Sequence, residues 1–76
     1  MKLQLLVTKT DFCLPNLERE LIHLGFEYDV LFIEDHPDMV ANHKIRHSPN
    51  ILINGDIAFR HQPTETELRN YFADII

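Results

Sequence analysis

Short apolar runs along the chain alternate with longer segments in which apolar residues recur every three or four positions. The runs predict β-strands, and the helical spacing predicts amphipathic helices that pack on a sheet. Leu14, Leu17, Leu21 and Leu24 form the clearest helical stripe, and Gly25 is a natural stop. The predicted elements are strand 2–7, helix 14–24, strand 26–33, helix 37–44, strand 50–53, strand 57–60 and a last helix from Thr64 through Ile75.

Turn residues indicate how these elements connect. Asn54-Gly55-Asp56 predicts a tight hairpin between two antiparallel strands. Thr64 and Glu67 form a capping box at the start of the last helix. A helix between the first two strands favours a parallel pair. The order β-α-β-α-β-β-α therefore predicts one α/β domain over residues 1–76, with a four-stranded mixed sheet flanked by helices.

Composition and charge exclude several classes of function. The chain has 76 residues, of which 45% are hydrophobic and 25% charged, as is ordinary for a small globular domain. A net charge of −5 with scattered basic residues gives no basic stripe, so we expect no nucleic-acid partner. The apolar start is too short for a signal peptide or membrane span, and a single cysteine fits a reducing compartment. We therefore expect a cytoplasmic monomer without a membrane partner.

Cys13, the only cysteine, lies where the first predicted strand gives way to the first predicted helix. A thiol at the first turn of a helix faces unpaired backbone N–H groups and the positive end of the helix dipole, and both favour the thiolate. Pro15 suits such a first turn. The segment Cys13-Leu14-Pro15-Asn16 has the spacing of a C-x-x-C redox motif with Asn16 at the second position. A small buried cysteine without reactivity is the alternative.

Two residues are candidates for modulating this thiol. Lys9 is the only basic residue shortly before Cys13, and Asp11 is a nearby acid whose charge opposes a thiolate. A solvated lysine without a role at the thiol is the alternative for Lys9. His47 lies two residues before Pro49 and, when protonated, could favour the thiolate if the chain brings it near Cys13.

Three histidines raise the question of a metal site. His43 and His47 are four residues apart, a spacing that can place two ligands on one helix face, and His36 precedes them. The predicted helix, however, ends near Ile45. Without further cysteines or a firm third ligand, we expect solvated or capping histidines and no metal.

The element order and the position of Cys13 resemble the minimal thioredoxin fold of glutaredoxins and small thioredoxins. A second segment, Ile45 to Gly55, reads I-R-H-S-P-N-I-L-I-N-G and is similar to the family segment V-R-S-V-P-T-L-V-I-N-G. The resemblance places Pro49 on the family's cis-proline, whereas the residues alone favour an ordinary trans proline. It implies that Ser48 and Pro49 flank Cys13 and that the Ser48 backbone pairs with a partner's extended chain.

Departures from the family pattern narrow the implied function. Because Asn16 replaces the second cysteine, a self-resolving dithiol cycle cannot operate, and a monothiol route remains. The motif also differs from the C-G-F-S sequence of cluster-binding monothiol glutaredoxins, so we expect no iron–sulfur cluster. Residues 61–64 lack the Gly-Gly-x-Asp type turn of glutathione-using members, so we expect no cofactor and leave glutathione open. Phe12 replaces the tryptophan of thioredoxins and keeps an apolar contact surface.

The resemblance thus implies a thioredoxin- or glutaredoxin-like protein of cell redox homeostasis. Cys13 would take part in thiol-disulfide exchange with a protein or a small thiol, while Ser48 and Pro49 dock the partner. Whether the chain is an oxidoreductase is left open because the resolving cysteine is missing. The alternative is a non-catalytic module that holds an extended peptide beside Phe12 and Pro49 by strand addition. Cys13→Ser separates the two, because only exchange needs the thiol.

Overall fold

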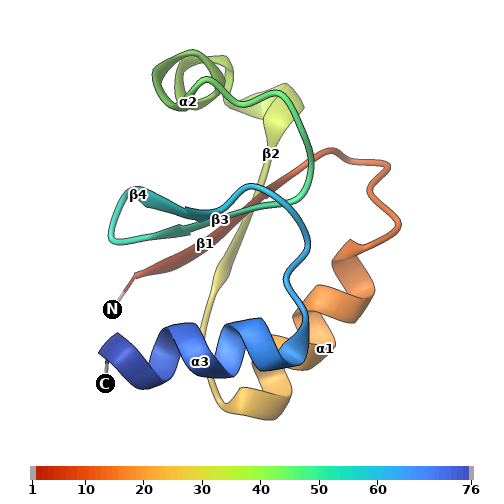
Figure 1. Cartoon of the computed structure of the whole chain (residues 1–76). Helices are drawn as coiled ribbons and strands as arrows, with labels where there is room; N and C mark the ends of the chain where they lie inside the picture. The colour runs from red at the N-terminus through yellow and green to blue at the C-terminus, as the bar shows by residue number, and fades with distance from the viewer. Residues whose placement is uncertain (1, 76) are drawn as a thin grey trace.

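A four-stranded mixed sheet forms the centre of the protein (Figure 1). The computed structural model describes residues 2–75. Its elements are β1 (Leu3–Val7), α1 (Leu14–Leu24), β2 (Asp29–Phe32), a short 3₁₀ turn η1 (Ile33–Asp35), α2 (Pro37–His43), β3 (Asn50–Ile53), β4 (Asp56–Phe59) and α3 (Glu65–Ile75). The strand order is β2-β1-β3-β4, with β1 parallel to β2 and antiparallel to β3, and β3 antiparallel to β4. The predicted α/β class and mixed sheet are confirmed.

Helices cover both faces of the sheet. On one face, α1 and α3 pack against β1 and β3, and Figure 1 shows these two helices together on one side with α2 on the other. The buried residues of this core are Leu3, Leu5, Val7, Leu17, Leu21, Ile51, Ile53, Leu68 and Phe72. On the other face, Leu6, Ile45 and Leu52 are buried under the α2 segment. Because neighbouring strand residues point to opposite faces, both cores together explain the continuous apolar run of β1.

None of the helices within residues 2–75 has the length and apolar character that crossing a membrane requires. The longest of them, α1 and α3, have 11 residues each. Both also carry a charged face, which suits helices that pack one side on a sheet.

The second strand is shorter than the prediction of 26–33. Gly25 has a left-handed φ of 83°, and the N–H groups of Gly25 and Phe26 donate to the last carbonyl groups of α1 at 3.0 Å each. Phe26 therefore belongs to the helix cap, in a Schellman arrangement, and β2 starts only at Asp29. At its other end, Ile33 opens η1. The remaining predicted bounds agree with the structure within one residue.

Two local motifs form as predicted. Asn54 and Gly55 have φ values of 53° and 88°, as a type I′ hairpin turn requires. At the start of α3, the Glu67 N–H donates to the Thr64 hydroxyl at 3.1 Å and the Thr64 N–H donates to the Glu67 carboxylate at 3.2 Å. The Thr64 backbone bond and a contact with His61 lower the pKa of Glu67, so this cap weakens as pH falls into the carboxyl range.

A hydrogen bond between Tyr28 and Glu18 ties the segment before β2 to α1. The Tyr28 hydroxyl donates to a Glu18 carboxylate oxygen at 2.6 Å. This bond, followed by burial and the negative charge of Glu18, raises the pKa of Tyr28 to about 12. Because the folded-state pKa is raised, the stabilisation by this bond is present below the ordinary tyrosine range and is lost as pH rises through that range to about 12.

We expect Glu18→Gln to lower the pKa of Tyr28 toward the ordinary tyrosine value, because the substitution removes both the charge and the ionic acceptor. Ultraviolet difference titration measures tyrosinate formation directly. Tyr28→Phe assigns the signal, since Tyr71 is the other tyrosine of the chain. An unchanged titration curve in Glu18→Gln would show that the bond does not control the phenol.

Candidate thiol site

Cys13 lies at the start of α1, after the loop that leaves the C-terminal end of β1 (Figure 1). It is the residue before Leu14, the first helical position, and its carbonyl oxygen accepts the Leu17 N–H at 3.1 Å. Pro15 is the second helical residue, where its missing N–H costs no helical bond. Cys13 is a free cysteine of intermediate exposure and is not among the buried core residues.

The Asp11 carboxylate connects Cys13 to Ser48, which is 37 residues away from Asp11 in the sequence. One carboxylate oxygen accepts the Cys13 N–H at 2.8 Å, and the other accepts the hydroxyl proton of Ser48. The Ser48 hydroxyl oxygen in turn accepts the Thr8 N–H at 3.1 Å. These two bonds orient the Ser48 hydroxyl, because a lone pair of its oxygen accepts the Thr8 N–H while its proton points to Asp11. Cys13 and Ser48 thus lie at the same end of the sheet.

Asn50 holds the loop that contains Ser48 and Pro49 against β1. Its side chain is 1% exposed, and its amide nitrogen donates to the carbonyl oxygens of Leu6 at 3.2 Å and His47 at 2.6 Å. The Ser48–Pro49 peptide bond is cis, and Pro49 is buried. Because both amide hydrogens have acceptors, the buried polar group is well satisfied. The loop is therefore anchored at the first residue of β3.

The residues around Cys13 in the sequence differ in exposure. Phe12 is 93% exposed, which is unusual for an aromatic side chain of this size. Leu14 is partly buried and packs against the core under α1. Pro15 and Asn16 are exposed on the first turn of the helix. The surface next to the thiol therefore offers an apolar ring and an amide to a partner.

The two candidate modulators of the thiol occupy different surroundings. The Lys9 ammonium pairs with Asp35 at 3.2 Å, and the Lys9 backbone N–H donates to the Glu34 carboxylate at 3.0 Å. These contacts direct Lys9 toward η1. His47 is exposed, and its carbonyl oxygen accepts a bond from Asn50. An effect of Lys9 or His47 on the thiolate stays a prediction.

His36, His43 and His47 do not form a metal site with neighbouring carboxylates within residues 2–75. Across the part of the chain that the structure describes, no three His, Cys, Asp or Glu side chains are grouped closely enough to hold a metal ion. His36 is the residue before α2, and His43 is the last residue of α2.

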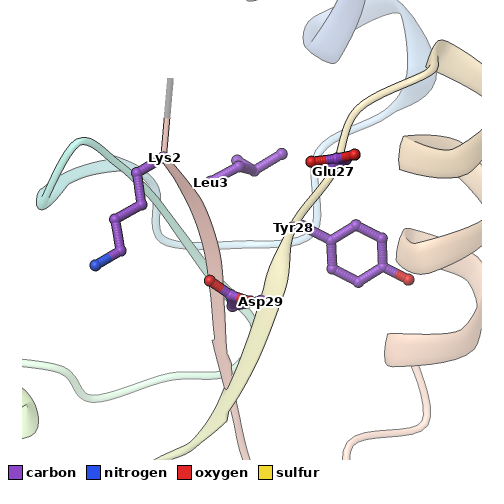
Figure 2. A pocket seen from close by; sticks show the side chains of 5 residues that line it. All are labelled: Lys2, Leu3, Glu27, Tyr28 and Asp29. Atoms are coloured by element: carbon purple, nitrogen blue, oxygen red, sulfur yellow. The ribbon is translucent and has the colours of Figure 1, made fainter.

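An open depression of about 590 Å³ lies at the opposite end of the sheet (Figure 2). It is lined by Lys2, Leu3, Glu27, Tyr28 and Asp29. Lys2 precedes β1 and Asp29 begins the parallel strand β2, so both mark the N-terminal ends of these strands, whereas the Cys13 loop follows the C-terminal end of β1. Figure 2 shows the Tyr28 ring directed away from Lys2 toward α1. The depression is therefore separate from the thiol site.

Sequence reasoning missed the roles of two residues. Asp11 was considered only as a charge that opposes the thiolate, although an aspartate two residues before a helix cap commonly accepts a backbone N–H from the second residue after it. That spacing could have predicted the bond to Cys13. For Asn50, the sequence pattern predicts only the first residue of a buried strand. A polar side chain at the head of the apolar run Ile51-Leu52-Ile53 was the available signal.

Cys13, Asp11 and Ser48 form one hydrogen-bonded unit that joins the N-terminus of α1 to the loop before β3. It contains the backbone N–H of Cys13, the Asp11 carboxylate and the Ser48 hydroxyl, and exposed Phe12 precedes Cys13 in the chain. No protein-family model, curated protein or solved structure matches this chain.

Proposed function

We propose that this chain is a thioredoxin- or glutaredoxin-like thiol protein that exchanges disulfides through Cys13. The observation that carries the proposal is the link from the Cys13 backbone N–H through the Asp11 carboxylate to the Ser48 hydroxyl, which supports a position of Cys13 near the Ser48–Pro49 loop. The order β-α-β-α-β-β-α, with sheet order β2-β1-β3-β4, supports a thioredoxin-like topology. Fold alone does not establish activity, so the argument rests on the site.

The chemistry begins with the Cys13 thiolate. The thiolate is the nucleophilic form of a cysteine, and Cys13 directly precedes the first residue of α1. The thiolate attacks one sulfur of a partner disulfide. The partner's S–S bond breaks, a Cys13–partner disulfide forms, and the second partner sulfur leaves as a thiolate that takes up a proton. This step needs no cofactor.

An external thiol completes the cycle, because the chain has no second cysteine. Its thiolate attacks the partner's sulfur in the mixed disulfide, and Cys13 leaves as the thiolate. The partner then carries a disulfide to the external thiol, and the protein is regenerated. Ser48 and Pro49 dock the partner's chain during both steps, and the partner is a protein or a small thiol or disulfide of the cytoplasm.

Exchange with hydroxyethyl disulfide, which is neutral and small, tests the proposal. Intact-mass spectrometry should detect one adduct on the folded chain, peptide mapping should locate it at Cys13, and an external thiol should remove it. Cys13→Ser should abolish adduct formation completely. If the folded chain forms no adduct under conditions in which the same chain unfolded in urea does, the sulfur is inaccessible and the proposal is wrong.

A non-catalytic binding module is the second candidate, and the 93% exposure of Phe12 favours it. An exposed aromatic ring shortly before α1 suits contact with an extended peptide. Under this alternative, Cys13→Ser keeps peptide binding while Phe12→Ala weakens it. Loss of both binding and exchange in Cys13→Ser would instead assign the contact to the thiol.

A further inference from the structure

We propose that Asp11 gives the Cys13 site a preference for cationic disulfides. This inference rests on the proposed exchange at Cys13 and names its substrate class. The Asp11 carboxylate accepts the backbone N–H of Cys13 at 2.8 Å. Covalent geometry then keeps this oxygen within about 7 Å of the sulfur in any rotamer of Cys13. A disulfide that reaches the sulfur must therefore enter the field of this carboxylate.

The hydrogen bonds of Asp11 satisfy its oxygens without cancelling its charge. Its two partners are the Cys13 amide and the Ser48 hydroxyl, which are both neutral donors. Within residues 2–75, the ion pairs of the chain join Lys9 to Asp35, His61 to Glu67 and Arg69 to Glu65, and none includes Asp11. A partly buried carboxylate without a cationic partner acts on approaching charges more strongly than a solvated ion pair does.

The charged groups on the surrounding loops do not reverse the negative electrostatic potential that Asp11 creates at Cys13. On the η1 side, Lys9 is paired with Asp35, and Glu34 adds a second carboxylate there. On the Ser48 side, Arg46 and His47 are exposed and precede the docking loop. The whole chain has a formal net charge of −5. The long-range field and the local field act in the same direction on a cationic substrate.

Coulomb's law sets the size of the effect. At about 7 Å in a water-like dielectric, one unit charge on the substrate changes the rate about three-fold through its interaction with Asp11. A cationic and an anionic disulfide should therefore differ by about three-fold to ten-fold because of this residue alone. The preference should shrink as salt is added, since screening acts over about 10 Å at 0.1 M ionic strength.

Cystamine, hydroxyethyl disulfide and oxidised glutathione provide cationic, neutral and anionic probes. We expect rates on the folded chain, each divided by the rate with a peptide of residues 12–16, which contains Cys13 but lacks Asp11, to fall in that order. Asp11→Asn keeps an amide oxygen as acceptor for the Cys13 N–H and removes the charge. It should reduce the cystamine-to-glutathione rate ratio about three-fold to ten-fold. Taking this ratio cancels any change in the thiolate fraction, which affects every probe equally.

Asp56→Asn is the matched control, because it makes the same change in net charge at the β3–β4 turn, at the other end of the sheet. It should leave the ratio unchanged. Asn16→Asp places a new negative charge in the first turn of α1, where helices tolerate it, and should increase the ratio. This second variant keeps the test valid if Asp11→Asn folds poorly. An unchanged ratio in folded Asp11→Asn overturns the inference, and so does an unchanged ratio in Asn16→Asp if Asp11→Asn does not fold.

Charged methanethiosulfonates separate failure of this inference from failure of the proposed function. These reagents modify any accessible thiol, so a cationic and an anionic reagent measure the field at Cys13 without requiring disulfide exchange. If all three disulfides fail to react while the reagents still report an effect of Asp11, the exchange function is wrong and the charge preference stands. If exchange proceeds but Asp11→Asn leaves the cystamine-to-glutathione rate ratio unchanged, the exchange function stands and the charge preference is wrong.

Discussion

Asn50→Asp should lower the free energy of unfolding by about 3–5 kcal/mol, the range found when a buried charge is left uncompensated. The Asn50 amide donates to the Leu6 and His47 carbonyl oxygens, and the side chain is 1% exposed. A carboxylate of the same shape has no hydrogen to donate and would face both oxygens. The total free energy of unfolding of a domain of this size is roughly 4–11 kcal/mol, so this loss should leave a substantial fraction of the chains unfolded.

Urea unfolding measures this loss, and Asn42→Asp, an exposed substitution on α2, is the matched control with an expected change within about 0.5 kcal/mol. The deficit of Asn50→Asp should shrink as pH falls, because a protonated carboxyl donates one hydrogen bond again. A loss below about 1 kcal/mol at neutral pH, or no dependence on pH, would show that Asn50 does not anchor the loop before β3.

Asp11→Ala should weaken folding by about 1.5–3 kcal/mol, because it removes a charge-assisted acceptor from both the Cys13 amide and the Ser48 hydroxyl. Ser48→Ala should remove part of the same folding stability, because it deletes the hydroxyl that donates to Asp11. In a double-mutant cycle of the two substitutions, we expect a coupling of about 1–2 kcal/mol, since the residues share one hydrogen bond. Ser48→Ala should also slow exchange with hydroxyethyl disulfide if the Ser48–Pro49 loop docks the partner as proposed.

The control for this cycle pairs Ser48→Ala with Asp56→Ala, which lies in β4 at the other end of the sheet. Residues without shared contacts should give additive effects within about 0.5 kcal/mol. Additivity of Asp11→Ala and Ser48→Ala to the same degree would mean that the thiol loop and the loop before β3 behave independently. The site would then lack the connection on which the proposed exchange depends.

Periodicity and local signals were sufficient to predict the elements of this fold. The stripe of leucines in α1, the turn at Asn54 and Gly55, and the Thr64 cap each act over a few residues, so they are readable from the sequence. The second strand was overestimated because residues 26–28 are β-formers. In the folded chain Phe26 completes the α1 cap, and Tyr28 packs against the core before β2 begins.

The site was only partly predictable, for a physical reason. Cys13 lies in the connection between β1 and α1 and directly precedes α1, so its place in the chain located it. The bond between Asp11 and Ser48 spans 37 residues and depends on the antiparallel pairing of β1 with β3. The pairing of Lys9 with Asp35 similarly depends on the parallel pairing of β1 with β2. Local sequence patterns do not show which distant strands pair or in which register. Only the family resemblance suggested that Ser48 and Pro49 approach Cys13.

The rate at which iodoacetamide alkylates Cys13 at about pH 7 tests the central claim most directly, because the thiolate is the reacting form. The comparison is with a peptide of residues 10–16, which keeps Asp11 and the neighbouring side chains but has no folded helix. A helix N-terminus favours an anion by about 0.3–1 kcal/mol, so the folded chain should react up to about five-fold faster than the peptide. A folded chain that reacts more slowly than the peptide would contradict a reactive thiol at the start of α1.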